Sequence, residues 1–312
     1  MKAAVVETFD APPRYGEFAE PRVEGEHEML VDVLAAGLHH RVRSQASGSH
    51  YTSSGVLPLI PGVDGVGRSP DGELRYFVLP HTAFGSMADK TVIDLRRSVP
   101  LAADVDPAAI AAAANPVMSS WIALRHRVDF TPGMTVMVFG ATGSSGRLAT
   151  QVARRLGAGR VVAVGRDARK LAALDVDATI DLSAASADHR LATEGAEADV
   201  VLDYLWGPVT ARALRAIVPA RTDDQRQLTW IEIGSMAGAE SAIPSAALRA
   251  TRLSLVGSGQ GSVAPGDIVA DLGDIASEIA SGAYHLDVRK VPLSQVESAW
   301  EATDDARVVL IP

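Results

Sequence analysis

The chain has 312 residues, of which 47% are hydrophobic and 21% charged, so it can bury a sizeable core in about two domains. Its formal net charge of -9 argues against a nucleic-acid partner, which usually requires a concentrated basic face. The absence of cysteine excludes disulfides and thiolate zinc sites, and it fits a cytoplasmic protein.

The N-terminus and the apolar runs predict neither a targeting segment nor a membrane partner. Glu7 and Asp10 occur too early for the apolar region of a signal peptide. The longest mostly apolar run, PAAIAAAANPVM (107–118), is too short to span a bilayer.

Short strands dominate the first hundred residues. KAAVVE (2–7), EMLVDVLAAGL (28–38) and KTVIDL (90–95) have strand-like patterns, and Pro and Gly interrupt the chain most visibly at LPLIPGVDGVG (57–67). This pattern predicts a compact β-rich domain.

From about Asp106 the pattern becomes helical, and Pro116 is expected to split the segment 106–128. Apolar strands and amphipathic helices then alternate: TVMVFG (135–140), LATQVARRLG (148–157), RVVAVG (160–165), ARKLAAL (168–174), ATIDL (178–182), ADVVLDYL (198–205), VTARALRAIV (209–218) and LTWIEIG (228–234). This alternation indicates βαβ units and a parallel sheet buried on both faces.

The remaining segments complete the expected order of elements. After LSLVGSG (253–259) we expect a helix over about 265–281, and RVVLIP (307–312) forms a last short strand. The charge-rich stretches 186–190 and 220–227 are expected to be solvated loops.

A glycine-rich turn follows the strand that begins at Thr135. Three glycines, Gly140, Gly143 and Gly146, lie between this strand and an amphipathic helix, with the spacing G-x-x-G-x-x-G. In that context the N–H groups of the helix N-terminus can bind a pyrophosphate, whereas the alternative is a purely structural turn. The candidate cofactor-binding residues here are Gly140, Thr142, Gly143, Ser144, Ser145 and Gly146.

The end of the next strand indicates which nicotinamide cofactor is used. An acidic residue there would receive the ribose of NAD, but this chain has Gly165, then Arg166, with Lys170 one helical turn later. A cation at this position suits the 2′-phosphate of NADPH. Asp167 either serves the ribose of NAD or caps the following helix; we favour the cap, and NADPH as cofactor.

The order and spacing of these segments resemble the zinc-independent quinone oxidoreductases of the medium-chain dehydrogenase/reductase superfamily. The motifs that carry the resemblance are MKAAVVETFDAPP, LVDVLAAGL, LPLIPGVDGVG, MSSWIALRHRVDFTPGMTVMVFGATGSSG, VVLDYLWG, IEIGSMAG and RVVLIP. The resemblance implies a GroES-like β-rich catalytic domain (1–115, completed by 260–312) and a Rossmann domain (116–259), with the active cleft between them. It also implies hydride transfer from NADPH to a quinone or an activated C=C bond, and a homodimer.

The chain departs from related enzymes at several positions. Zinc alcohol dehydrogenases of the superfamily carry Gly-His-Glu where this chain has Gly62-Val63-Asp64, so we expect no metal. His39 stands where many members have Asn, and Leu182 stands where related reductases often have Tyr beside the 2′-phosphate.

The chemistry requires a proton donor, because the cofactor carries only the hydride. His39, His40 and Tyr51 lie on the segment that resembles the active-site lip, and either histidine can protonate an enolate or hydroquinone near neutral pH. The alternatives are a surface role for His40 and a packing role for Tyr51.

Further cofactor contacts are expected from a helix and from two later turns. Ser119 takes the place of a family Thr or Ser near the nicotinamide, or is a helix residue without a ligand, and Trp121 is expected in the core. Two glycine segments are expected at the carboxyl edge of the sheet, where they contact the cofactor or form ordinary tight turns. Their candidate residues are Gly234, Ser235, Gly257, Ser258 and Gly259.

Two classes of function remain open at the level of sequence. The first is an NADPH-dependent reductase whose partner is a small-molecule quinone or enone. The second is a catalytically idle NADPH-binding protein, structural or sensory, with the same fold.

Overall fold

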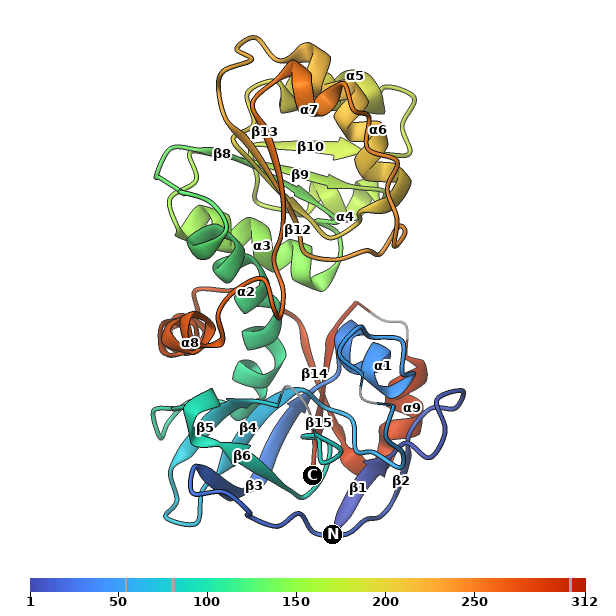
Figure 1. Cartoon of the computed structure of the whole chain (residues 1–312). Coiled ribbons are helices and arrows are strands. Elements are labelled where there is room, and N and C mark those ends of the chain that lie inside the picture. The colour runs from blue at the N-terminus through green and yellow to red at the C-terminus, as the bar shows by residue number, and fades with distance from the viewer. Residues whose placement is uncertain (54, 80–81, 303–304) are drawn as a thin grey trace. The chain divides into compact units, whose positions relative to one another are not determined.

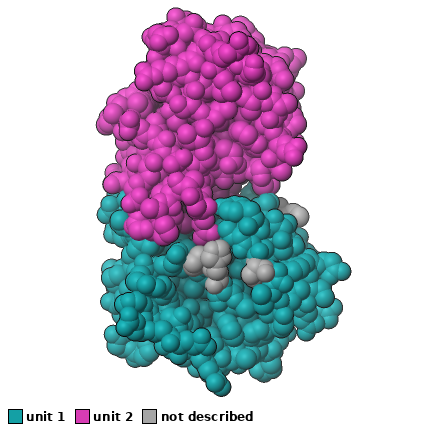
Figure 2. All heavy atoms as spheres, in the orientation of Figure 1, with its two compact units in different colours: residues 1–115, 269–312 teal, residues 116–268 magenta. Residues whose placement is uncertain are grey.

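The computed structural model describes residues 1–53, 55–79, 82–302 and 305–312. The chain forms two compact units, one of Met1–Asn115 with Val269–Pro312 and the other of Pro116–Ile268 (Figure 2). Both ends of the chain therefore belong to the first unit. Two helices, α2 (Pro107–His126) and α8 (Pro265–Ala280), run across the division points.

The first unit is built on a sheet in the order β14-β15-β3-β4-β5-β7, with β6 paired to β3. Its elements are β1 (Lys2–Val5), β2 (Arg14–Glu17), β3 (Glu28–Gly37), α1 (His40–Ala46), β4 (Asp64–Arg68), β5 (Leu74–Val78), β6 (Lys90–Asp94), β7 (Ser98–Pro100), β14 (Val288–Pro292), α9 (Val296–Glu301) and β15 (Arg307–Ile311) (Figure 1). Strand β15 pairs antiparallel with β3, where Leu310 lies opposite Ala36. The expected pairing of RVVLIP with the N-terminal strands is therefore present.

The second unit contains a six-stranded sheet in the order β10-β9-β8-β11-β12-β13, and every pairing in it is parallel. Its elements are β8 (Thr135–Phe139), α3 (Ser144–Arg155), β9 (Arg160–Gly165), α4 (Ala168–Ala172), β10 (Ala178–Asp181), α5 (Ala187–Gly195), β11 (Val200–Asp203), α6 (Gly207–Ile217), β12 (Leu228–Glu232), α7 (Ala247–Ala250) and β13 (Leu253–Gly257). Helices α3 and α4 cover one face of the sheet and α5 and α6 the other (Figure 1). The predicted parallel sheet is confirmed.

The prediction that Pro116 splits this helical segment is wrong, because α2 continues through Pro116. Proline lacks an N–H, so the Ala112 carbonyl four residues earlier loses its intrahelical donor. The Nε of Arg307, which is buried at the start of β15, donates to that carbonyl at 3.2 Å. A donor from the far end of the sequence thus replaces the missing helical hydrogen bond.

Because α2 is continuous, its apolar stretch is longer than the run 107–118 expected from the sequence. Among the described residues, α2 is the one helix long and apolar enough to cross a membrane by length and composition. However, 72% of its apolar window is buried inside the protein, as is typical of a core helix.

The two charge-rich stretches are not simply solvated loops. Residues 187–190 form the first turn of α5, and Ala187 is fully buried. Arg221 is also buried, and its guanidinium donates to Thr251 Oγ1 and to the carbonyls of Ala198 and Arg226. Three well-placed acceptors make the burial of this cation tolerable.

Candidate functional site

The glycine turn is formed by the end of β8 and the start of α3. All five residues of β8 are buried, and the chain leaves it through Gly140, whose φ of +86° strongly favours glycine. The N–H groups of Gly140 and Ala141 both donate to the Val164 carbonyl, at 2.9 and 3.0 Å. These bonds tie the turn to the neighbouring strand β9.

The other two glycines of the turn differ in their surroundings. A Cβ at Gly146 would overlap the Gly140 carbonyl oxygen, so α3 packs against the turn only because residue 146 has no side chain. A Cβ at Gly143 would meet only the Gly140 oxygen, at 3.5 Å, which leaves the space above this position open. The first helical hydrogen bond runs from the Arg147 N–H to the Gly143 carbonyl, so the N–H groups of Ser144, Ser145 and Gly146 have no acceptor within the helix. Such N–H groups are suited to an anion, and the pyrophosphate site here stays a prediction.

This turn lies where the order of the strands reverses. From β8 the chain moves outward to β9 and β10, then crosses to β11 on the other side of β8. In open parallel sheets, ligands bind outside the carboxyl ends of the strands at this switch point. The predicted glycine segments after β9, β12 and β13 end at the same edge, so the fold brings these candidates together.

At the end of β9, Arg166 is exposed and follows the buried Gly165. Gly165 must be small because a Cβ there would come within 2.7 Å of the Thr142 Cγ2. The Asp167 carboxylate accepts from the Lys170 N–H at 3.0 Å and caps α4. The predicted cap is confirmed, and one carboxylate oxygen is thereby occupied.

Ser119 on α2 reaches the segment that follows β11. Its hydroxyl donates to the Pro116 carbonyl at 2.7 Å and lies 2.8 Å from the Tyr204 hydroxyl. Because the Ser119 proton is engaged with Pro116, Tyr204 is the donor in that pair. Burial raises the pKa of Tyr204 to about 12, which keeps this donor protonated. Trp121 is 5% exposed, as expected for a core residue.

The two later glycine segments use many of their backbone groups internally. Gly234 N–H donates to the Asp203 carbonyl at 3.2 Å, whereas the exposed Ser235 lies at the following turn. Ser258 N–H donates to the Glu232 carbonyl at 2.8 Å. The Gly257 carbonyl accepts from Arg127 Nε and the Gly259 N–H donates to Ser262 Oγ, both at 2.8 Å. These bonds favour the tight-turn interpretation for 257–259.

In the first unit, His39 lies at the start of α1 and is turned inward. Its Nε2 lies 3.0 Å from Asp64 Oδ1, and the Tyr76 hydroxyl donates to Asp64 Oδ2 at 2.9 Å. All three side chains are buried. Burial lowers the pKa of His39 although the hydrogen bond to Asp64 opposes that shift, so the environment favours a neutral imidazole.

His40 and Tyr51 are both at the surface. His40 is exposed, with its Nδ1 3.4 Å from Ser44 Oγ. Tyr51 is 72% exposed and its ring stacks on His50 with centroids 4.4 Å apart. The structure therefore separates the three predicted proton donors into one buried and two exposed side chains.

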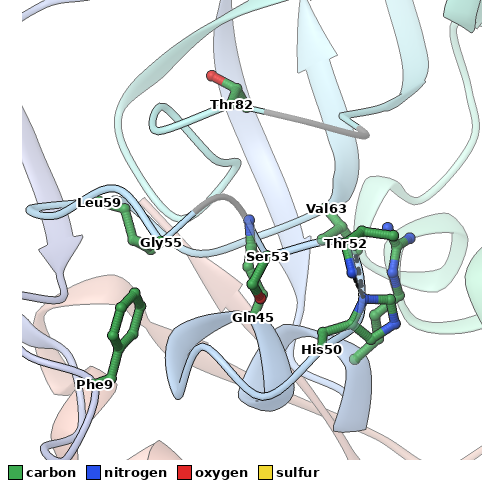
Figure 3. A pocket seen from close by; sticks show the side chains of 10 residues that line it. Phe9, Gln45, His50, Thr52, Ser53, Gly55, Leu59, Val63 and Thr82 are labelled. Carbon is green, nitrogen blue, oxygen red and sulfur yellow. Dashed lines mark hydrogen bonds between the residues drawn. The ribbon is translucent and has the colours of Figure 1, made fainter.

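Four polar residues of this region have no role in the predictions from sequence: Arg41, His50, Asp64 and Tyr76. Arg41 and His50 line a pocket beside α1 (Figure 3). The high proportion of polar side chains over 39–53 is the sequence feature that could have pointed to these residues. The described residues contain no group of three or more His, Asp or Glu suited to a metal ion, and the expectation of a metal-free site stays a prediction.

No protein-family model matches the chain. Over the full length of both proteins, it is 32% identical to the Emericella nidulans protein named "Probable NADPH-dependent quinone reductase tdiC". It superposes on a quinone oxidoreductase from Thermus thermophilus, a protein also solved in complex with NADPH, with a TM-score of 0.82, 25% identity and complete coverage of both chains. A quinone oxidoreductase from Pseudomonas syringae shares the fold at 22% identity, with a TM-score of 0.79 over both complete chains. The predicted fold class, a GroES-like β-rich unit with a Rossmann unit, is confirmed.

Proposed function

Because the chain belongs to the quinone oxidoreductase family of the medium-chain dehydrogenase/reductase superfamily, we propose that it transfers a hydride from NADPH to a quinone or an activated C=C bond. The observation that carries the proposal is the open glycine turn at the switch point of the parallel sheet. A catalytically idle role is the less favoured alternative, since the full-length relative is named as a reductase.

The second unit is suited to hold NADPH. The N–H groups at the start of α3 would bind the pyrophosphate, and the space above Gly143 admits it. Arg166 would hold the 2′-phosphate, with Lys170 as a weaker second cation, because Asp167 is committed to its cap. Ser119 accepts from Tyr204 and keeps a lone pair, so it can accept from the nicotinamide carboxamide.

The first unit would supply the groups that act on the acceptor. When bound, NADPH supplies the hydride, and the reduced acceptor is left with an oxyanion that needs stabilisation and a proton. We assign proton transfer to the segment of His39, His40 and Tyr51. His39 is held by Asp64, which fixes the orientation of its ring, whereas His40 and Tyr51 are open to solvent.

The test is a screen of quinones and α,β-unsaturated ketones with NADPH, followed by the loss of nicotinamide absorbance. The matched control is Gly146→Val, in which the added side chain overlaps the Gly140 carbonyl and distorts the turn. We expect substrate-dependent oxidation by the wild type and loss of NADPH binding in the variant. NADPH binding without turnover of any acceptor would support the idle alternative.

We also propose that the protein is a zinc-independent, cytoplasmic homodimer. Strand β13 is the last strand of its sheet among the described residues, and its side chains are half-buried or exposed, so its outer edge can pair with a second copy. Light scattering should give twice the chain mass. Ser254→Lys, which places a charge on the exposed position of this edge strand, should shift the mass toward that of one chain.

A further inference from the structure

A pocket in the first unit is lined by hydrogen-bond donors and one cation. It lies beside α1, and Figure 3 shows its lining side chains. The lining residues are Phe9, Arg41, Gln45, His50, Thr52, Ser53, Gly55, Leu59, Val63 and Thr82. None of these ten is Asp or Glu, so the one formal charge in the lining is the positive charge of Arg41.

The tautomer of His50 is determined by its neighbour. The backbone N–H of Thr52 donates to His50 Nδ1 at 3.2 Å, and Thr52 Oγ1 lies 2.8 Å from the same atom. A backbone N–H can only donate, so Nδ1 is the acceptor and the proton of the neutral ring is on Nε2. Burial lowers the pKa of His50 to about 4, with the nearby Arg41 and His40 adding to the shift. At neutral pH His50 is therefore an uncharged donor through Nε2.

Two further lining residues offer donors. The Oε1 of Gln45 accepts from the Gly62 N–H at 3.1 Å, which orients the amide so that its NH2 group is the remaining polar end. The Ser53 hydroxyl oxygen is buried and has no hydrogen-bond partner among the described residues. A buried hydroxyl without a partner is costly, and a ligand oxygen in the pocket would relieve that cost.

Arg41 is half-buried on the first turn of α1. Burial lowers the pKa of Arg41 and the negative charge of Asp64 raises it, and the Asp64 carboxylate also accepts hydrogen bonds from His39 and Tyr76. The apolar part of the lining comes from Phe9, Leu59 and Val63. The cavity volume of about 20 Å³ has room for one oxygen-sized group, so the ring that carries this oxygen would lie outside the pocket.

Resting on the function proposed above, we propose that this pocket binds an anionic oxygen of the acceptor, through Arg41, His50, Gln45 and Ser53. The enzyme would thus select quinones that carry a carboxylate or an ionised ring hydroxyl. A guanidinium with neutral donors around it recognises such an oxygen by charge-assisted hydrogen bonds, and the pocket offers no acceptor carboxylate to repel it.

Two matched pairs of acceptors test this proposal and distinguish the two sources of charge. The first pair is a benzoquinone with a short carboxylate side chain and its methyl ester. The second is a hydroxynaphthoquinone, whose ring hydroxyl ionises, and its methyl ether. We expect the wild type to prefer the charged member in kcat/KM by about tenfold to a hundredfold, in one pair or in both.

Three variants test whether the preference for charged acceptors depends on the Arg41 guanidinium. Arg41→Met should bring the two members of a pair to within about threefold in kcat/KM, because turnover of the charged member falls much more than that of the uncharged member. Arg43→Met is the matched control, because Arg43 lies on the same helix but is directed over the Trp300 ring, so it should keep the preference. Ser53→Ala should reduce the preference by a smaller factor without loss of folding, since the Ser53 hydroxyl oxygen has no hydrogen-bond partner within the described part of the chain.

The outcomes are distinct from those of the proposed function. Equal turnover of charged and uncharged members by the wild type, or equal effects of Arg41→Met and Arg43→Met, would overturn the subsite. If neither member is reduced, the hydride-transfer proposal fails, and calorimetry of the full chain with naphthoate and methyl naphthoate decides the subsite. Tighter binding of naphthoate to the wild type than to Arg41→Met supports it, and equal binding overturns it.

Discussion

Arg166 is the residue on which the choice of cofactor depends. Its side chain is exposed at the end of β9, while the neighbouring Asp167 is held in the cap of α4. A charge-assisted hydrogen bond is worth about 1.5–3 kcal/mol, or roughly tenfold to a hundredfold in affinity. We therefore expect Arg166→Ala to weaken NADPH binding by about that factor and to leave NADH binding nearly unchanged, as measured by titration of both cofactors.

Lys170→Ala should have a smaller effect than Arg166→Ala. The Lys170 ammonium is a point charge without the paired N–H donors of a guanidinium, so its removal should lower the affinity for NADPH less. Added salt should weaken NADPH binding more than NADH binding, because the extra contact is Coulombic. Equal losses of both cofactors in Arg166→Ala would show that Arg166 does not contact the 2′-phosphate.

His50 should make the folded protein sensitive to mild acid. The pKa of His50 is about 4 in the folded chain and ordinarily 6.5, so between these values the unfolded chain binds more protons than the folded one. Stability must then fall as the pH falls through this range. We expect the urea midpoint to drop less between pH 7 and pH 5 in His50→Gln than in the wild type. Parallel midpoint curves for the two proteins would contradict this assignment.

At the scale of elements, α2 depends on a residue from β15. Arg307→Met would leave the Ala112 carbonyl without a donor, which costs about 1–3 kcal/mol in the free energy of unfolding. Pro116→Ala restores an N–H that can bond this carbonyl within the helix. We therefore expect Arg307→Met to cost about 1 kcal/mol less in the Pro116→Ala background, measured by urea unfolding of the four proteins.

The double-mutant comparison removes other contributions of Arg307. Its attraction to Asp64 is present in both backgrounds and cancels in the difference. Strictly additive costs would mean that Arg307 does not compensate for the proline. The continuity of α2 would then come from side-chain packing alone.

At the scale of the whole molecule, we predict that activity is independent of metal. The chain has no cysteine, and Val63 occupies the position where the resemblance places a histidine ligand of zinc alcohol dehydrogenases. Prolonged dialysis against a strong chelator should leave the rate of NADPH oxidation unchanged. If dialysis abolished the activity and added zinc restored it, the prediction of a metal-free enzyme would be wrong.

The sequence by itself determined the features that depend on neighbouring residues. The strand, turn and helix around Gly140–Gly146 were predictable because glycine spacing and apolar periodicity are local properties. The cap by Asp167 was predictable for the same reason, since its acceptor and the Lys170 N–H lie three residues apart. The parallel sheet followed from the alternation of such local patterns.

Only the tertiary structure decided the contacts between distant residues. His39 and Asp64 are 25 residues apart, and Arg307 and Ala112 are 195 apart, so no local pattern joins them. The same holds for the pocket, where Phe9, Val63 and Thr82 meet the polar face of α1. Whether a histidine is a buried, neutral group or an exposed base depends on the groups packed around it, because burial and neighbouring charges set its pKa. For that reason the sequence could propose 39–51 as the segment that supplies a proton donor, but only the fold showed that His39 is buried while His40 and Tyr51 are exposed.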